Sequence, residues 1–117
     1  MRALLIFSLL LILLRPAVAD CVTGDHFACA TLDGFDEVVA ALKAGSQNAV
    51  HTPGCDYTEP GHKVRVIGPM LALAEPIAIF YGDSAVTKAS GVPDVFRSMA
   101  HSGWVDVWTV KENVVCN

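Results

Sequence analysis

The sequence predicts an α+β fold in which one N-terminal helix packs on a small, mainly antiparallel sheet or barrel cross-linked by disulfides. Apolar residues at positions 35, 38, 39 and 42 follow the i, i+3, i+4, i+7 spacing of an amphipathic helix. Later segments alternate apolar and polar residues with the period of two that is typical of half-buried strands. Four cysteines in 117 residues add an even number of cross-linking groups.

Residues 1–19 have the features of a cleaved signal peptide. Arg2 precedes an apolar run, and the segment ends in the small-x-small sequence Ala17-Val18-Ala19. Cleavage after Ala19 leaves a single domain, residues 20–117. We therefore expect a protein exported to the periplasm or secreted. No later apolar run approaches the roughly 20 residues of a membrane span, so the mature chain is not expected to cross a membrane.

Charge narrows the range of partners. The leader contains 2 of the 8 basic residues and none of the 12 acidic ones, so the mature chain has a net charge of −6. Nucleic acids and anionic membranes are bound by basic patches, which this sequence lacks. We expect a neutral or cationic partner.

The cysteines are expected to form structural disulfides in an oxidising compartment. Their spacing contains no Cys-x-x-Cys motif and none of the close doublets of zinc sites, so neither a metal nor another cofactor is expected. Pairing Cys29 with Cys55 would tie down the helix, and pairing Cys21 with Cys116 would join the termini. The alternative, Cys21 with Cys29 and Cys55 with Cys116, remains open at this point.

The helix is expected from Asp33, as N-cap, to Ala44, with Gly45 ending it. It follows a short entry segment, and a loop over Ser46–Gly61 comes next. Four strands are expected: Lys63–Ile67, Ile77–Tyr81, Trp104–Val110 and Asn113–Cys116. A further short strand is expected at Val86-Thr87. A competing fold has three or four strands and a second helix, at Met70–Ala74 or Asp94–Ala100.

Two short motifs carry a family resemblance. Gly61–Ile67 follows a Pro-Gly turn and is similar to an entry strand, while Gly103-Trp104-Val105 is similar to a late Gly-Trp-Val signature. By these motifs residues 61–115, about half the chain, resemble the bacterial small β-barrels of the Src-homology-3 type. The chain differs from that family in the long stretch Gly82–Ser102, where the family has a short hairpin. The resemblance implies a cell-wall-binding or peptide-binding module without catalysis.

The histidines and one local Ser-His-Asp cluster are the candidate groups for metal binding or catalysis. His26, His51, His62 and His101 are scattered, with no pair at i+3 or i+4 that would indicate a metal site. Ser98, His101, Ser102 and Asp106 lie close in sequence. No Gly-x-Ser-x-Gly turn accompanies them, so an enzyme is not expected.

The last predicted strand supplies the candidate ligand-binding residues. If Val105 and Val107 point inward, the strand period sends Trp104 and Trp108 outward with Asp106 between them. Together with Tyr81 these side chains would form an amphipathic ligand-binding face. In the opposite arrangement the tryptophans form the core. The core arrangement is favoured in so small a domain, because a buried tryptophan contributes a large apolar area.

From these observations we expect an exported, non-enzymatic binding or adaptor domain whose partner is a protein, a peptide or a cell-wall glycan. Two alternatives belong to other classes. One is a small inhibitor acting through the disulfide-pinned loop Ser46–Gly61. The other is a structural subunit of an envelope complex that contacts its neighbours through the apolar segment Met70–Ala74.

Overall fold

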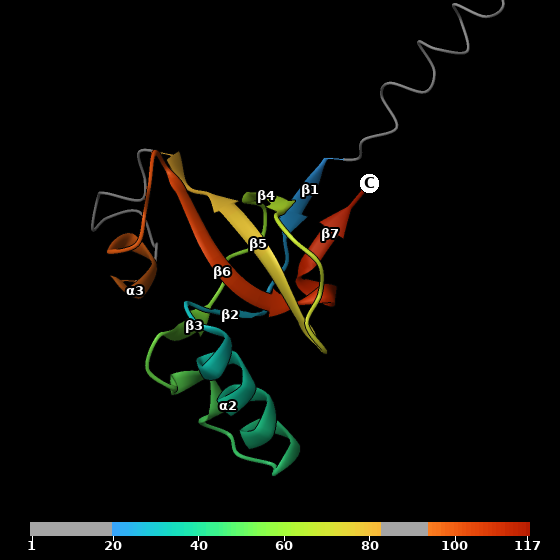
Figure 1. Ribbon diagram of the computed structural model, residues 1–117, viewed down its shortest axis with the longest axis vertical. Helices are drawn as coiled ribbons and strands as arrows, with labels where there is room; N and C mark the ends of the chain where they lie inside the picture. Colours follow the sequence, from blue (N-terminus) through green and yellow to red (C-terminus); the bar gives the residue numbers. More distant parts are fainter. Residues whose placement is uncertain (1–19, 83–93) are drawn as a thin grey trace, which may run out of the picture.

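The computed structural model describes residues 20–82 and 94–117 and shows a seven-stranded antiparallel sheet with helical segments beside it (Figure 1). The predicted leader and the predicted Val86-Thr87 strand lie outside the described residues. The strands are β1 (Cys21–Thr23), β2 (Phe27–Cys29), β3 (Cys55–Tyr57), β4 (Lys63–Val66), β5 (Ala74–Phe80), β6 (Trp104–Val110) and β7 (Val114–Cys116). The helical segments are α2 (Leu32–Lys43), η2 (Ala49–His51), α3 (Asp94–Arg97) and η5 (Lys111–Asn113).

The strand order is β3-β2-β6-β5-β4-β1-β7, so β3 and β7 are the two edges and the sheet is open over the described residues. The long β5–β6 pair forms the centre, in register from Ala74 opposite Val110 to Phe80 opposite Trp104. The predicted helix-plus-antiparallel-sheet class is confirmed. A closed barrel is not what this sheet forms.

Helix α2 begins two residues earlier than predicted, because Thr31 rather than Asp33 is the N-cap. The Thr31 hydroxyl accepts a hydrogen bond from the Gly34 amide at 3.0 Å, which satisfies one of the free amides of the first turn. Two strands, β1 and β2, precede the helix. The helix is therefore inserted between β2 and β3. The prediction of a helix that precedes the sheet is wrong.

Two hydrophobic clusters hold the layers together. The first lies on one face of the central strands and includes Phe96 of α3 among its buried residues: Ala28, Val64, Ile77, Ile79, Tyr81, Phe96, Val105 and Val107. The second lies between the sheet and α2, where the rings of Phe27 and Phe35 stack with centroids 5.7 Å apart. Val105 and Val107 are buried in the first cluster, so the arrangement favoured from the sequence, in which the tryptophans take their place in the core, is wrong.

Both disulfides form, in the pairing that joins the termini and pins the helix. Cys21–Cys116 links β1 to β7 and Cys29–Cys55 links β2 to β3, each between directly paired residues. None of the four thiols is free. Two disulfides in a domain of this size indicate an oxidising, exported environment.

The remaining segments resolve the open predictions. Residues 70–73 form the turn of the β4–β5 hairpin, and β5 starts at Ala74, three residues earlier than predicted. Residues 94–97 form a single helical turn, and the predicted loop 46–61 contains η2 and β3. In the part of the chain that the structure describes, each helix is too short or too polar to cross a membrane.

Candidate functional site

The candidate site is a cavity of about 540 Å³ beside strands β4, β5 and β6, on the face opposite the first hydrophobic cluster. Strand register builds its floor, because Arg65 pairs with Ala78 and Ala78 pairs with Asp106. These three residues form one row across the sheet, on the same face of their strands. The cavity is lined by Arg65, Met99, His101, Ser102, Trp104 and Asp106.

Trp104 forms the aromatic wall of the cavity. The Cζ atom of Arg65 lies 4.3 Å from the centroid of the indole, a cation–π distance. On another side the Phe80 ring tilts against the indole with centroids 4.9 Å apart. Trp104 is half-buried, so it is fixed by neighbours yet keeps exposed ring surface for a ligand.

A tight turn places the two sides of the cavity next to each other. His101 and Trp104 exchange backbone hydrogen bonds of 2.8 and 2.9 Å around the central residues Ser102 and Gly103. Both central residues have positive φ, 52° and 84°, as a type I′ hairpin turn requires. Gly103 also accepts hydrogen bonds from the amides of Tyr81 and Gly82 through its carbonyl. The turn is thereby joined to the end of β5.

Charge in the cavity is divided between two exposed side chains. Arg65 and Asp106 sit at opposite ends of the row, with the methyl group of Ala78 between them. Among the side chains of residues 20–82 and 95–117, His62 and Glu59 form an ion pair, whereas Arg65 and Asp106 form none. Neither cavity charge is therefore neutralised by a described side chain.

The predicted aromatic face is divided by the structure. Trp104 and Trp108 do lie on one face of β6, but Trp108 packs against the cluster beneath α2. Tyr81 does not join them, because it is 6% exposed and belongs to the first cluster. Of the predicted ligand-binding residues, the cavity brings together Trp104 and Asp106.

The Tyr81 side chain lies in a different environment. Its ring meets the edge of His62 with centroids 4.5 Å apart, and its hydroxyl is buried with no hydrogen-bond partner among the described residues. Burial, followed by the negative charges of Glu59 and Asp56, raises the pKa of Tyr81 to about 12. The phenol therefore stays protonated at physiological pH.

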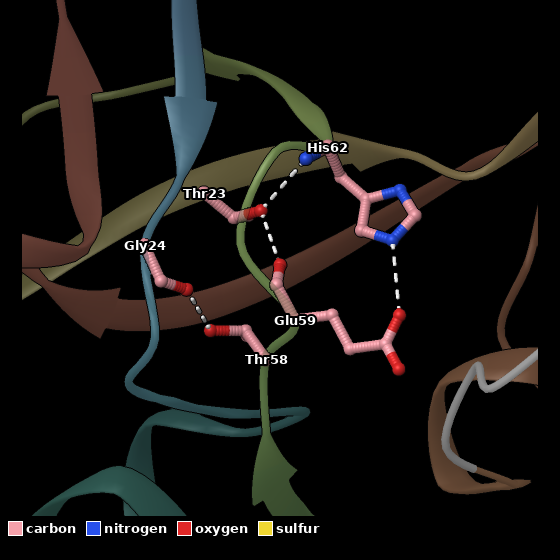
Figure 2. Close-up of polar contacts among 5 residues, drawn as sticks. All are labelled: Thr23, Gly24, Thr58, Glu59 and His62. Atoms are coloured by element: carbon pink, nitrogen blue, oxygen red, sulfur yellow. Dashed lines mark hydrogen bonds and ion pairs between the residues drawn. The ribbon is translucent and has the colours of Figure 1, made fainter.

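Close to Tyr81, a polar cluster fixes the segment 58–62 against β1 (Figure 2). The Thr23 hydroxyl donates to the Glu59 carbonyl at 2.6 Å and accepts from the His62 amide at 3.0 Å. The Thr58 hydroxyl donates to the Gly24 carbonyl at 3.0 Å. The His62 ring reaches the Glu59 carboxylate at 3.8 Å. These contacts are satisfied within the fold, and we assign this cluster a structural role.

The local Ser-His-Asp group is partly brought together. His101, Ser102 and Asp106 line the cavity, whereas the Ser98 hydroxyl donates to the Val95 carbonyl. In the described part of the chain, no hydrogen bond links the three side chains that line the cavity. Searched over the same residues, no group of three His, Cys, Asp or Glu side chains could hold a metal ion.

Sequence reasoning missed Arg65, Phe80 and Met99 as neighbours of Trp104. The alternation of Lys63–Ile67 did place Arg65 on the polar face of its strand. What the alternation cannot supply is the register that sets β4 and β6 on either side of β5. Comparison of the chain with protein-family models, with curated proteins and with solved structures finds no match.

Proposed function

We propose that this chain is an exported binding domain that holds its ligand in the cavity beside Trp104. The observation that carries the proposal is a half-buried indole, clamped between Arg65 and Phe80, that faces a cavity lined by both a cation and an anion. Small-ligand sites are usually concave, partly apolar and supplied with a few oriented polar groups. A cavity of about 540 Å³ lies in their usual size range.

The proposal includes cleavage after Ala19 and delivery to the periplasm or the medium, with no reaction carried out on the ligand. It also includes the family resemblance. Its support is that the two motifs of the resemblance fall on β4 and on the start of β6. A Src-homology-3-type binding module is thus the ancestry that we propose for residues 61–115.

Ligand-observed NMR against a set of short peptides and amino-sugar oligosaccharides tests the proposal. A true ligand should bind the wild type, and binding should be lost in Trp104→Ala while the mutant remains folded. Tyr57→Ala is the matched control, because Tyr57 is an aromatic side chain that is 51% exposed and lies outside the cavity. Binding that survives Trp104→Ala would overturn the site.

A second candidate function, a structural subunit of an envelope complex, is favoured by one observation. The β4–β5 hairpin exposes a run of uncharged apolar side chains, including Met70 at 40%, Leu71 at 48% and Leu73 at 54%. Exposed apolar groups gathered at one place are typical of contact surfaces. Site-specific photo-crosslinking from position 71 in intact cells tests it: a discrete adduct is expected, and its loss is expected in Leu73→Ser. A cross-linker that reacts with no protein there would exclude this function.

A further inference from the structure

We infer that the Trp104 cavity recognises the free carboxyl end of a short peptide, with Arg65 binding the terminal carboxylate. The inference deepens the proposed function and rests on it, because it uses the same cavity. Three features of the cavity define the ligand: the planar donor of Arg65, the opposed carboxylate of Asp106, and the apolar wall formed by Trp104 and Met99.

Arg65 is prepared to bind a carboxylate. The Cζ atom of Arg65 lies over the indole of Trp104, 4.3 Å from its centroid, and this contact restricts the motion of the side chain. The N–H donors of a guanidinium lie in the plane of the group. No carboxylate in residues 20–82 or 95–117 forms an ion pair with Arg65. A rigid, planar, unneutralised guanidinium matches the two oxygens of a carboxylate, which it can bind through two parallel hydrogen bonds.

Asp106 determines which group of the ligand lies at the other end of the cavity from the terminal carboxylate. Two strand spacings separate Asp106 from Arg65, roughly 10 Å between backbones. A carboxylate at that end of the row repels a second anion and accepts N–H groups. A short extended peptide of two or three residues spans roughly 7–10 Å. Such a peptide carries its carboxylate at one end and its ammonium or amide N–H groups at the other, in the order of the two protein charges.

The same pair of charges disfavours polyanions. A phosphate chain or nucleic acid that reached Arg65 would lie across Asp106, on a mature chain whose net charge is already −6. The cavity also has apolar lining, since Trp104 and Met99 border it and the methyl group of Ala78 lies between the two charges. We therefore assign an uncharged, apolar side chain to the middle of the bound peptide.

The probe is the tripeptide Ala-Leu-Ala with a free carboxylate, compared with the same tripeptide as its C-terminal amide. Titration is followed through the indole N–H signals in ¹H–¹⁵N spectra. Trp104 should shift, and Trp108 serves as an internal reference because it packs in the α2 cluster. We expect the amide to bind at least tenfold more weakly. Equal binding of the two forms would overturn the assignment of the carboxylate.

Charge-removing variants show whether binding depends on the charge of Arg65 itself or only on the net charge of the protein. Arg65→Gln should lose at least tenfold in affinity for the free tripeptide. The matched control is Lys63→Gln, which removes the same charge from the same face of β4, two residues away and outside the cavity lining. Asp106→Asn should weaken the free-amine tripeptide and leave the N-acetylated tripeptide nearly unchanged. An equal loss in the Arg65 and Lys63 variants would contradict a specific carboxylate site.

Failure of this inference can be told apart from failure of the proposed function. If amino-sugar oligosaccharides shift Trp104 and the tripeptides do not, the cavity is a binding site and the peptide assignment is wrong. If the tripeptides bind but shift only signals far from Trp104, both proposals are wrong. If the free tripeptide shifts Trp104 and Arg65→Gln abolishes the shift, both are supported.

Discussion

At the scale of single residues, Tyr81 places a polar hydroxyl group inside the hydrophobic core. Its hydroxyl lost its hydrogen bonds to water on folding and gained none among the described residues. An unsatisfied buried hydroxyl costs roughly 1–3 kcal/mol, so Tyr81→Phe should leave the free energy of unfolding unchanged or increase it. Urea unfolding at pH 7 measures this. A loss of more than about 1 kcal/mol would show that the hydroxyl has a partner.

The same residue makes stability depend on pH. The pKa of Tyr81 is about 12 in the folded chain and close to 10 in the unfolded chain, so the folded state holds the proton more tightly. Above about pH 10 the unfolded chain loses that proton first, and the free energy of unfolding falls as the pH rises towards 12. Tyr81→Phe removes this slope. Unfolding series for both proteins between pH 8 and 11 should diverge only above pH 10.

The two tryptophans should respond differently to truncation. Trp108 packs under α2 with the second cluster, whereas Trp104 contacts Phe80 and Arg65 and borders a cavity. We expect Trp108→Ala to cost about 3 kcal/mol or more, and Trp104→Ala about 1–2 kcal/mol. Thermal and urea unfolding of both variants provide the comparison. The decisive result is which variant loses more free energy of unfolding. A larger loss in Trp104→Ala than in Trp108→Ala would show that Trp104 belongs to the core.

At the scale of elements, the turn between His101 and Trp104 depends on Gly103. A Cβ added there would lie 2.9 Å from the Gly82 Cα, at a φ of 84°. Gly103→Ala should therefore cost the conformational penalty of roughly 1–2 kcal/mol together with about 1–3 kcal/mol for the clash. Gly45→Ala is the matched control, with φ of 81° and nothing within 4 Å of the added atom. Equal losses in the two variants would mean that the turn moves away from β5.

The elements also show what sequence can and cannot supply. Long, strongly patterned segments such as Trp104–Val110 and the stripe around Val38 were located correctly, because their periodicity spans several residues. Strands β1, β2 and β3 have three residues each, too few for alternation to be seen. The N-cap was misplaced by two positions because Thr31 and Asp33 are both good capping residues, and only the backbone decides between them.

For the candidate site, the register between strands is what the sequence could not predict. Alternation correctly put Trp104 and Asp106 on one face of their strand, but it could not show that the helix covers Trp108 or that Arg65 lies across Ala78. Tyr81 was assigned to the wrong surroundings because it comes one residue after the end of β5, beyond the regular alternation of the strand. Contacts between distant strands depend on pairing that no local pattern encodes.

At the scale of the whole molecule, the disulfides carry a large part of the stability. Cys21–Cys116 closes 95 residues and Cys29–Cys55 closes 26. The chain-entropy model assigns them about 4.7 and about 3.5 kcal/mol. A domain of this kind has roughly 5–15 kcal/mol in total. The double variant Cys21→Ala/Cys116→Ala should therefore unfold in urea at a much lower concentration. An unchanged midpoint would show that β1 and β7 hold together without the cross-link.

The pairing of β1 with β7 also orders events in time. Ribosomes synthesise a chain from its N-terminus, so Cys29 meets Cys55 early, whereas Cys21 must wait for Cys116, 95 residues later in the sequence. During that interval the Cys21 thiol is exposed to two wrong partners from the same chain. A truncated product that lacks Cys116 would keep an unpaired, reactive thiol at Cys21. Closure of the β1–β7 pair is thus linked to synthesis of the β7 segment, and an odd free thiol would mark any molecule that stopped before it.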